Sequence, residues 1–333
     1  MELSRRFSVA PMMDRTDRHC RVLMRLLSRR ALLYTEMVTS PALVRGRSPE
    51  RFLEFSDTEH PVALQLGGSD PRELSTAARM AEERGYDEIN LNVGCPSDRV
   101  TSGRFGACLM AEPQLVADCV AAMRAVVKIP VTVKTRIGID HLDSPEYLAG
   151  FISAVAEAGC RTFIIHARKA WLKGLSPKEN REIPPLHYER VHDLKVRFPK
   201  LEFILNGGIV DLDVGAAHMT SAHGAPLDGV MVGRAAYDTP YILADVDRLY
   251  FGETASPPTR AEVVAAYAEY ASAQVASGVF AHHVMRHAAG LFHGCPGARN
   301  WRTSVMSCGR EGNNITELVA LAARMDHGTA EAA

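Results

Sequence analysis

Long hydrophobic runs are absent from this 333-residue sequence. A membrane-spanning helix needs about 20 consecutive apolar residues, and no stretch approaches that length. The apolar run that follows Arg5 and Arg6 covers only residues 7–10, which is too short for a secretory signal. The sequence therefore predicts a cytoplasmic protein.

Closely spaced cysteines are lacking too. The seven cysteines lie far apart, with no C-x-x-C pair and no tight Cys/His spacing. This distribution argues against a zinc site and a disulfide framework, and it suits a reducing compartment. We therefore expect no metal in this protein.

Net charge is almost absent, because 38 basic residues stand against 39 acidic ones. Nothing in the average composition favours a polyanionic partner, so any nucleic-acid surface has to be local. The motif G-x-G-x-x-G after the first strand, which is typical of doubly wound sheets, is also missing.

Short apolar segments do alternate with helical patterns along most of the chain. The helical patterns include residues 71–84, 113–127, 144–158 and 185–198. Short strands joined by crossover helices predict a parallel sheet covered on both faces. Eight such units over about 240 residues predict an α/β fold, the (β/α)8 TIM barrel. The candidate strands are residues 7–10, 32–34, 62–66, 89–93, 130–134, 162–165, 203–205 and 229–232.

The pattern changes after residue 248. Gly252, Pro257 and Pro258 indicate a linker, and the helical patterns beyond it, at 260–277, 281–293 and 316–325, include no strand. The predicted divisions are a barrel over residues 1–248, a linker at 249–258, a helical domain at 259–326 and a frayed tail at 327–333.

One cysteine stands at a predicted strand end. The strand at residues 89–93 stops at Gly94, and Cys95 is held between that glycine and Pro96. Glycine adopts backbone angles that other residues avoid, and proline keeps the preceding residue out of the helical region. Cys95 is therefore placed at the mouth where such barrels carry their active sites; a buried core cysteine is the alternative.

Other predicted strand ends suit a flat, phosphorylated cofactor. Lys134 supplies a fixed positive charge, and Gln65 offers both a hydrogen-bond donor and an acceptor. His166 follows another apolar run, where a core histidine is the alternative. The loops after strands seven and eight, which often bind phosphate, read Asn206-Gly207-Gly208 and Gly233-Arg234. FMN fits this set better than pyridoxal phosphate, for which no carboxylate partner of the ring nitrogen can be placed.

Two local basic patches interrupt the neutral average. Residues 280–310 contain no Asp or Glu, but they contain Arg286, Arg299, Arg302 and Arg310 beside histidines and aromatic residues such as Trp301. The loop at 166–185 adds five basic residues against two glutamates. Such patches predict contacts with nucleic-acid phosphates, and a solvated helix face is the alternative.

These residues, in this order, resemble the tRNA-dihydrouridine synthase family over nearly the whole chain. The shared motifs are A-P-M-M-D-R-T-D at 10–17, Q-L-G-G at 65–68, N-L-N-V-G-C-P at 90–96, V-K at 133–134, H-A-R at 166–168, N-G-G at 206–208 and V-G-R at 232–234. The loop at 166–185 is similar to that of the branch whose members reduce uridines 20 and 20a in the tRNA D-loop. Met13 is a small variation in the first motif.

The resemblance implies a reaction and its residues. NADPH would reduce FMN, the flavin N5 would deliver hydride to C6 of a uracil ring, and Cys95 would protonate C5. The target base would have to leave its stack. The residues implied for FMN are Pro11, Met12, Met13, Gln65, Lys134, His166, Asn206, Gly207, Gly208, Gly233 and Arg234. Those predicted to contact the tRNA are Asn92, Arg168, Lys169, Ser176, Lys178, Glu179, Arg299 and Arg302.

Two alternatives remain at this point. A dihydroorotate or dihydropyrimidine dehydrogenase uses the same barrel and FMN on a free pyrimidine, but has no use for a basic helical domain. A non-catalytic tRNA-binding protein would carry an inert barrel and no flavin. The sequence does not specify the oligomeric state, and we expect a monomer.

Overall fold

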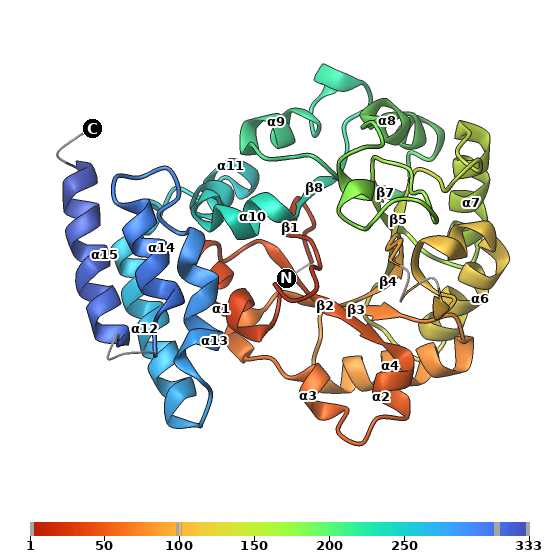
Figure 1. Cartoon of the computed structure of the whole chain (residues 1–333). Helices are drawn as coiled ribbons and strands as arrows, with labels where there is room; N and C mark the ends of the chain where they lie inside the picture. The colour runs from red at the N-terminus through yellow and green to blue at the C-terminus, as the bar shows by residue number, and fades with distance from the viewer. Residues whose placement is uncertain (1–2, 98–99, 101, 310–313, 331–333) are drawn as a thin grey trace.

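The computed structural model describes residues 3–97, 100, 102–309 and 314–330. Its centre is a closed barrel of eight parallel strands in chain order, surrounded by helices (Figure 1). The predicted TIM barrel is therefore confirmed. The strands are β1 (Phe7–Val9), β2 (Leu32–Thr39), β3 (Val62–Gly67), β4 (Glu88–Val93), β5 (Val131–Arg136), β6 (Thr162–His166), β7 (Glu202–Asn206) and β8 (Gly229–Val232).

Strand β2 is much longer than the predicted residues 32–34. The register shifts between Tyr34 and Met37, and the strand then pairs with β3 as far as Thr39. Its polar residues in the middle, including Glu36, hid this extension from the apolar pattern. The longer strand carries Met37 to the mouth of the barrel.

Helix α4 (Pro71–Arg84) shows why the covering helices begin and end where they do. The Asp70 carboxylate accepts hydrogen bonds from the first-turn amides, and Gly85 closes the helix in the left-handed conformation. The other covering helices are α1 (Arg18–Leu27), α2 (Ser40–Val44), α3 (Glu50–Leu53), α6 (Pro113–Arg124), α7 (Pro145–Glu157), α8 (Tyr188–Arg197), α9 (Leu212–Ala217), α10 (Arg234–Asp238) and α11 (Val246–Phe251).

Three of these helices are shorter than predicted, although α7 differs by only one residue at each end. Helix α6 ends at Arg124, and α8 begins at Tyr188 and not at Pro185. The later start of α8 has a clear cause, because the His187 N–H donates to the Ala167 carbonyl and so fixes the preceding loop against the end of β6.

A buried network of charged and hydroxyl side chains closes the amino-terminal end of the barrel. Arg5 forms ion pairs with Glu88 and Glu202, and the hydroxyls of Tyr34 and Thr132 donate to Glu88. Arg5 and Glu88 are almost entirely buried. Paired charges thus fill this end of the barrel, where apolar side chains could have done so. We call Arg5, Tyr34, Glu88, Thr132 and Glu202 the basal network.

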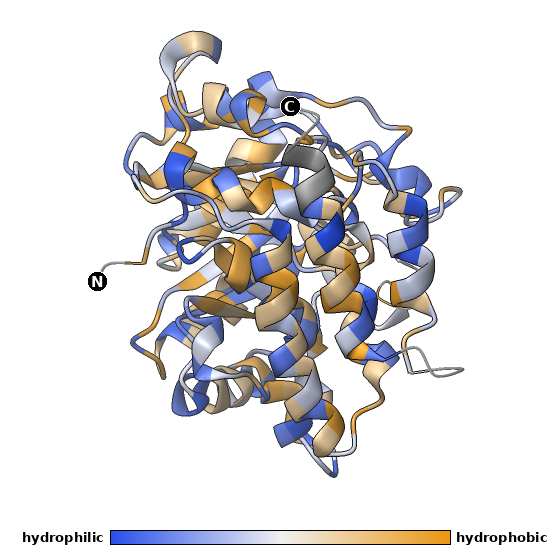
Figure 2. Ribbon diagram, turned by 90° about the vertical axis from the view of Figure 1, so that its left-hand side faces the viewer, coloured by the Kyte–Doolittle hydropathy of each residue, from blue (hydrophilic) through white to orange (hydrophobic). Residues whose placement is uncertain are grey.

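The C-terminal helices lie side by side against α1 on one flank of the barrel (Figure 1), and this flank faces the viewer in Figure 2. Buried aromatic contacts join the two parts: the Tyr267 hydroxyl donates to the carbonyls of His19 and Val284, and His19 Nδ1 lies 2.8 Å from Tyr270 Oη. The elements are α12 (Arg260–Ala276), α13 (Ala281–Met285), the 3-10 helix η6 (Arg286–Gly290), α14 (Ala298–Met306) and α15 (Ile315–Ala330).

Helix α14 was not predicted from the sequence, and three further details of this part differ from the sequence-based expectations. The single helix predicted at 281–293 is wrong, because the chain tightens into η6 at Arg286. Helix α11 continues past residue 248, the predicted end of the barrel, because buried Tyr250 packs on Phe7 of β1. The extended segment that corresponds to the predicted linker therefore starts after Gly252. Helix α15 continues to Ala330, since no proline interrupts it, while 331–333 lie outside the described residues. The proposed domain boundaries remain a prediction.

Within the described ranges, no helix combines the length and the apolar character that crossing a membrane requires.

Candidate active site

A cavity of about 600 Å³ opens at the carboxyl ends of the strands. Its size lies within the range of roughly 300–1,000 Å³ that is usual for small-molecule sites. Cys95 and Asn92 border it together with every residue predicted to hold the cofactor, namely Pro11, Met12, Met13, Gln65, Lys134, His166, Asn206, Gly207, Gly208, Gly233 and Arg234. The structure thus brings seven separate strand ends together at one site.

The Cys95 loop is held in place by its own backbone contacts. Asn92 Oδ1 accepts the N–H groups of Gly94 (3.1 Å) and Cys95 (3.0 Å), and the Cys95 carbonyl accepts the N–H of Ala107 at 2.9 Å. Gly106 has φ 75°, and a Cβ there would lie 2.6 Å from the Cys95 carbonyl oxygen. The thiol therefore sits on a fixed turn, with Ser97 Oγ at 3.5 Å from its sulfur.

A ladder of amide side chains crosses the cavity floor. Gln65 Nε2 donates to Asn90 Oδ1 at 2.8 Å, and Gln65 Oε1 accepts from Asn92 Nδ2 at 2.9 Å. Asn90 in turn donates to the Thr132 hydroxyl at 2.9 Å. These bonds fix the orientation of each amide, so the ladder presents a rigid polar edge to a bound ring.

Lys134 and His166 lie next to the amide ladder on the cavity wall. Lys134 Nζ donates to Asn206 Oδ1 at 2.9 Å, and Asn206 Nδ2 donates to the Met231 carbonyl at 2.8 Å. Burial, with the charge of Arg136 adding to it, lowers the pKa of Lys134 to about 7. Burial and the same neighbouring charges hold the pKa of His166 well below its usual value, so its imidazole is neutral.

Gly207 is required at its position beside His166. Its φ is 110°, and a Cβ would lie 2.6 Å from His166 Cδ2. Gly208 also has a positive φ of 70°. The loop after β7 can therefore turn sharply over the floor and expose its backbone to a ligand.

The charge of the cavity wall is one-sided. Among the described residues that line the cavity there is no Asp or Glu, whereas five basic side chains do line it: Arg15, Lys134, Arg136, Arg181 and Arg234. A cavity with this lining favours an anionic ligand, and glycine backbone amides after β7 and β8 are common phosphate donors in TIM barrels. The residues present therefore fit a phosphorylated cofactor such as FMN.

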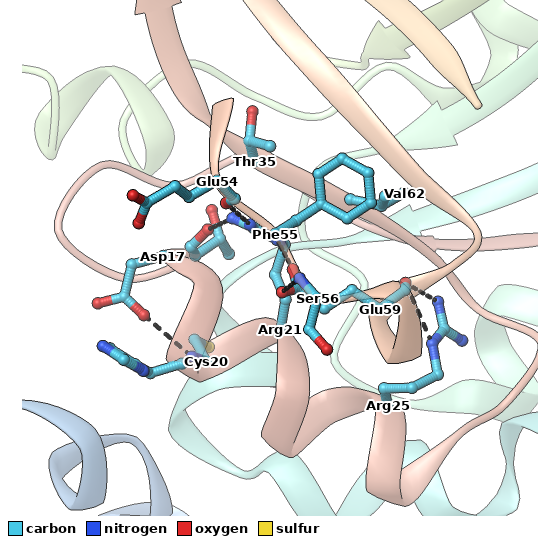
Figure 3. A network of polar contacts seen from close by, with 12 residues as sticks. Asp17, Cys20, Arg21, Arg25, Thr35, Glu54, Phe55, Ser56, Glu59 and Val62 are labelled. Carbon is cyan, nitrogen blue, oxygen red and sulfur yellow. Dashed lines mark hydrogen bonds and ion pairs between the residues drawn. The ribbon is translucent and has the colours of Figure 1, made fainter. Parts of the chain in front are cut away.

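The loop after β1 is supported from behind by α1 (Figure 3). Arg21 Nη1 donates to the Thr16 carbonyl at 2.9 Å, while its Nε donates to Glu59 at 2.6 Å. The Thr16 hydroxyl accepts the Met12 N–H at 3.0 Å. Arg21 of α1 is thus buried and holds Thr16, and through it Met12, at the cavity.

Arg136 connects two loops and is a site residue that the sequence reasoning missed. Its Nε donates to the Gly94 carbonyl at 2.8 Å, and its Nη1 donates to the carbonyls of Lys169 (3.1 Å) and Asn180 (3.0 Å). The Cys95 loop is thereby joined to the loop at 166–185. That arginine stands at the end of an apolar strand, as Lys134 does, and this was the available signal.

The loop at 166–185 is compact. The buried Asn180 side chain bonds the backbone of Trp171 and Leu175, and this folding turns Arg181, also missed as a site residue, into the cavity. Lys169 pairs with Asp143 at 2.9 Å and lies over the Trp171 ring.

The remaining residues predicted on this loop do not line the cavity. Arg168 donates to the Pro184 carbonyl, and Ser176 and Glu179 bond each other's backbone N–H. Lys178 is exposed. Ser176 and Glu179 are exposed as well, whereas Arg168 is half-buried, and the predicted contact of these residues with tRNA stays a prediction.

The basic patch of the C-terminal helices divides into two faces. Arg299 and Arg302 are exposed on α14, three residues apart and so on one side of the helix. Trp301 is buried against Phe292 and cannot stack on a base, which corrects its place in the predicted surface. Arg286 faces the barrel and pairs with Asp17, and Arg310 lies outside the described residues.

No group of three or more side chains able to hold a metal ion occurs in the part of the chain that the structure describes. The closed barrel, with a thiol, a lysine and glycine loops at its carboxyl mouth, defines a barrel enzyme with an anion-binding site. The sequence model of the dihydrouridine synthase family matches residues 8–325. The chain therefore belongs to that family, whose members are flavin-dependent oxidoreductases.

Relatives within the family are similar over almost their full length. The tRNA-dihydrouridine(20/20a) synthase of Vibrio parahaemolyticus is 58% identical over 306 residues, 92% of this chain and 92% of its own. Those of Shewanella oneidensis and Escherichia coli K12 are 56% and 60% identical, covering 96% and 90% of this chain and 93% and 85% of their own.

A solved 2-naphthoyl-CoA reductase in complex with 2-naphthoyl-CoA shares the fold. It superposes with a TM-score of 0.57 at 10% identity, covering 74% of this chain and 51% of that one. At this identity the likeness concerns the fold alone.

Proposed function

We propose that this protein is a tRNA-dihydrouridine(20/20a) synthase, which uses NADPH and FMN to reduce the C5–C6 double bond of D-loop uridines 20 and 20a. The observation that carries the proposal is the family membership, with relatives of that name 56–60% identical over about nine-tenths of the chain. The cationic cavity with Cys95 at its edge supports it independently.

The cavity residues suit the binding of FMN. The backbone of Gly207 and Gly208, with Gly233 and Arg234, would hold the phosphate, and Lys134 would face the electron-rich edge of the ring system. Gln65, fixed by its two amide bonds, would contact a ring N–H or carbonyl. The flavin, once reduced by NADPH, supplies the hydride for C6 of the uracil.

Cys95 would supply the proton for C5. Its loop keeps the thiol at the cavity edge, and a protonated thiol can serve as a general acid. Hydride and proton together saturate the C5–C6 bond, and the thiolate left behind takes its proton back from solvent. Asn92 would then act mainly by holding the Cys95 loop, because its oxygen is used by two backbone N–H groups.

The charged surfaces would bring the tRNA to this cavity. Arg299 and Arg302 are exposed and suited to phosphate contacts, and Arg181 extends the positive surface into the mouth. A target base has to be turned out of its stack to reach Cys95, which costs a few kcal/mol. Phosphate contacts outside the cavity can provide that free energy.

The test is a nucleotide-by-nucleotide map of dihydrouridine in tRNA from a strain that lacks the gene, before and after treatment with the purified protein and NADPH. We expect dihydrouridine to return at positions 20 and 20a. Its return at other positions would keep the family reaction but overturn the site preference. No return, together with reduction of a free pyrimidine, would favour the dehydrogenase alternative.

A further inference from the structure

Asp17 lies where the cavity meets the C-terminal helices. It directly follows the loop of residues 11–16 that borders the cavity, and it is the N-cap of α1. Its Oδ1 accepts the Cys20 N–H at 2.9 Å (Figure 3). Aspartate is a common cap of this kind, so capping alone explains only one of its oxygens.

The other contacts of Asp17 come from the C-terminal helices. Arg286 Nη2 donates to Asp17 Oδ2 at 2.9 Å, and His287 Nε2 lies 3.0 Å from Oδ1 and 3.1 Å from Oδ2. The His287 side chain is fully buried. Burial acts to raise the pKa of Asp17, but its contacts with His287, Arg286 and the Cys20 N–H together outweigh burial and hold that pKa well below its usual value. The carboxylate is therefore charged at neutral pH.

His287 also contacts a second wall of the cavity. Its Nδ1 lies 3.2 Å from the hydroxyl of Tyr237 on α10, the helix that begins at Arg234. The Arg15 guanidinium lies over the Tyr237 ring at 4.8 Å and pairs with Asp238 at 3.0 Å. The loop after β1 and the helix after β8 thus both meet at His287.

The same point is connected to α14. Trp301 Nε1 donates to the Ala288 carbonyl at 2.8 Å, one residue beyond His287. Arg299 and Arg302 lie on the exposed side of the same helix. A short series of contacts therefore joins the exposed arginines of α14 to the loop that borders the cavity.

We propose that Asp17 is a positioning residue for the reaction. Through its contacts with Arg286 and His287, and the contact of His287 with Tyr237, it fixes the C-terminal helices relative to the two cavity walls. A tRNA bound on α14 then presents its base to Cys95. This inference rests on the proposed function. Asp17 touches neither cofactor nor substrate, and its effect is on alignment. Misplacement of reacting groups by about 1 Å can reduce a rate by roughly 10²-fold.

The informative variant is Asp17→Asn. Asparagine is as good an N-cap as aspartate, so α1 keeps its start, while the charge that pairs with Arg286 and His287 is removed. Asp70→Asn is the matched control, because Asp70 caps α4 in the same way, at 2.8 and 3.1 Å, and its carboxylate forms no ion pair with any described residue. Tyr237→Phe tests the second contact, since it removes only the hydroxyl.

In the FMN-loaded protein with full-length tRNA we expect Asp17→Asn to lower kcat by about 10–100-fold. The Kd for tRNA, the flavin content and the rate of flavin reduction by NADPH should change less than about threefold, and Asp70→Asn should resemble the wild type. Tyr237→Phe should act in the same direction, and the double variant should lose less than the product of the two single losses.

Hydrogen exchange supplies a readout that does not depend on turnover. Asp17→Asn should speed amide exchange both in residues 12–16 and in residues 286–290, whereas Asp70→Asn should not. Unchanged kcat, or a parallel loss of flavin affinity and kcat, would overturn the positioning role. If the wild-type protein formed no dihydrouridine at all, the proposed function would be overturned. The connection between the two segments has its own test: faster amide exchange of Asp17→Asn in only one of them would overturn it.

Discussion

The two ends of the barrel bury charge in different ways. At the amino-terminal end, Arg5 lies between Glu88 and Glu202, and hydroxyls complete the coordination of Glu88. At the carboxyl mouth, Lys134 and Arg136 bond only to neutral oxygen atoms among the residues that the structure describes. At the amino-terminal end the buried positive charge is paired with carboxylates, whereas at the mouth it bonds to neutral oxygen atoms and can attract an anionic ligand.

This difference separates scaffold from site. A buried charge that has its partner contributes to the integrity of the fold, and removal of one partner is costly. A buried charge without a counter-charge has its pKa shifted, as for Lys134, and such shifts are concentrated at functional sites. Variants at the two ends should therefore fail in different assays.

The largest effect is expected at Cys95 in the mouth. Cys95→Ala should reduce uridine reduction by about 10²–10⁴-fold, the usual contribution of a general acid, while flavin content, flavin reduction and stability stay near wild type. Single-turnover kinetics with reduced enzyme and tRNA measure this. Cys108→Ala, another partly buried free thiol, is the control; near-normal turnover of Cys95→Ala would remove Cys95 as the acid.

At the opposite end, Glu88→Gln should act on stability. It leaves Arg5 with only the partly exposed Glu202, and breaking a buried pair typically costs about 3–5 kcal/mol. Denaturant unfolding of the apoprotein provides the measurement. Glu54→Gln, which breaks the exposed pair with Arg18, should cost less than about 1 kcal/mol. Equal effects of the two variants on the free energy of unfolding would contradict the structural role given to the buried ion pair of Arg5 and Glu88.

The pH dependence of flavin binding probes Lys134. Its pKa is lowered to about 7 in the free protein, so its charge is lost as pH rises through neutrality. An electron-rich ligand prefers the charged form, and the Kd for FMN should therefore increase above about pH 7, by up to about tenfold per pH unit. Lys134→Met should flatten this profile.

The stability of the apoprotein should respond to Lys134 with the opposite sign. Unfolding restores the ordinary lysine pKa of 10.5, so between about pH 7 and 10.5 the unfolded chain binds the extra proton. The Lys134 contribution to the free energy of unfolding then rises with pH. A Kd for FMN that falls as pH rises would contradict the assignment of Lys134 as the charged group that contacts the flavin.

The smallest effect is expected outside the barrel. Arg299→Ala combined with Arg302→Ala should weaken tRNA binding severalfold and reduce the slope of log affinity against log salt by about 2. Flavin reduction by NADPH should not change. The control is Arg197→Ala combined with Lys200→Ala, which removes the same charge at the C-terminal end of α8. Equal losses of tRNA affinity in the two double variants would mean that only the net charge of the protein matters.

Local patterns were enough to predict the barrel and most of its mouth. Each strand end carries its chemistry in a short motif, and parallel closure brings the motifs together without further information. The limits appeared where contacts between distant segments decide the structure. The start of α8 depends on a bond from His187 to Ala167, and the continuation of α11 depends on packing of Tyr250 against Phe7.

The same limit applies to individual residues. Arg286, Arg299 and Arg302 look alike in the sequence, but Arg286 is used by Asp17, 269 positions away. Trp301 appeared to belong to a surface and is buried. Arg181 enters the site because Asn180 folds the loop at 166–185, which spacing along the chain does not reveal.

The most direct test of the account is the affinity of the apoprotein for FMN compared with riboflavin, which lacks only the phosphate. If the unbalanced charge of the mouth serves an anionic cofactor, FMN should bind at least about 10²-fold more tightly, since two charge-assisted hydrogen bonds contribute roughly 1.5–3 kcal/mol each. Equal affinities for the two flavins would contradict it.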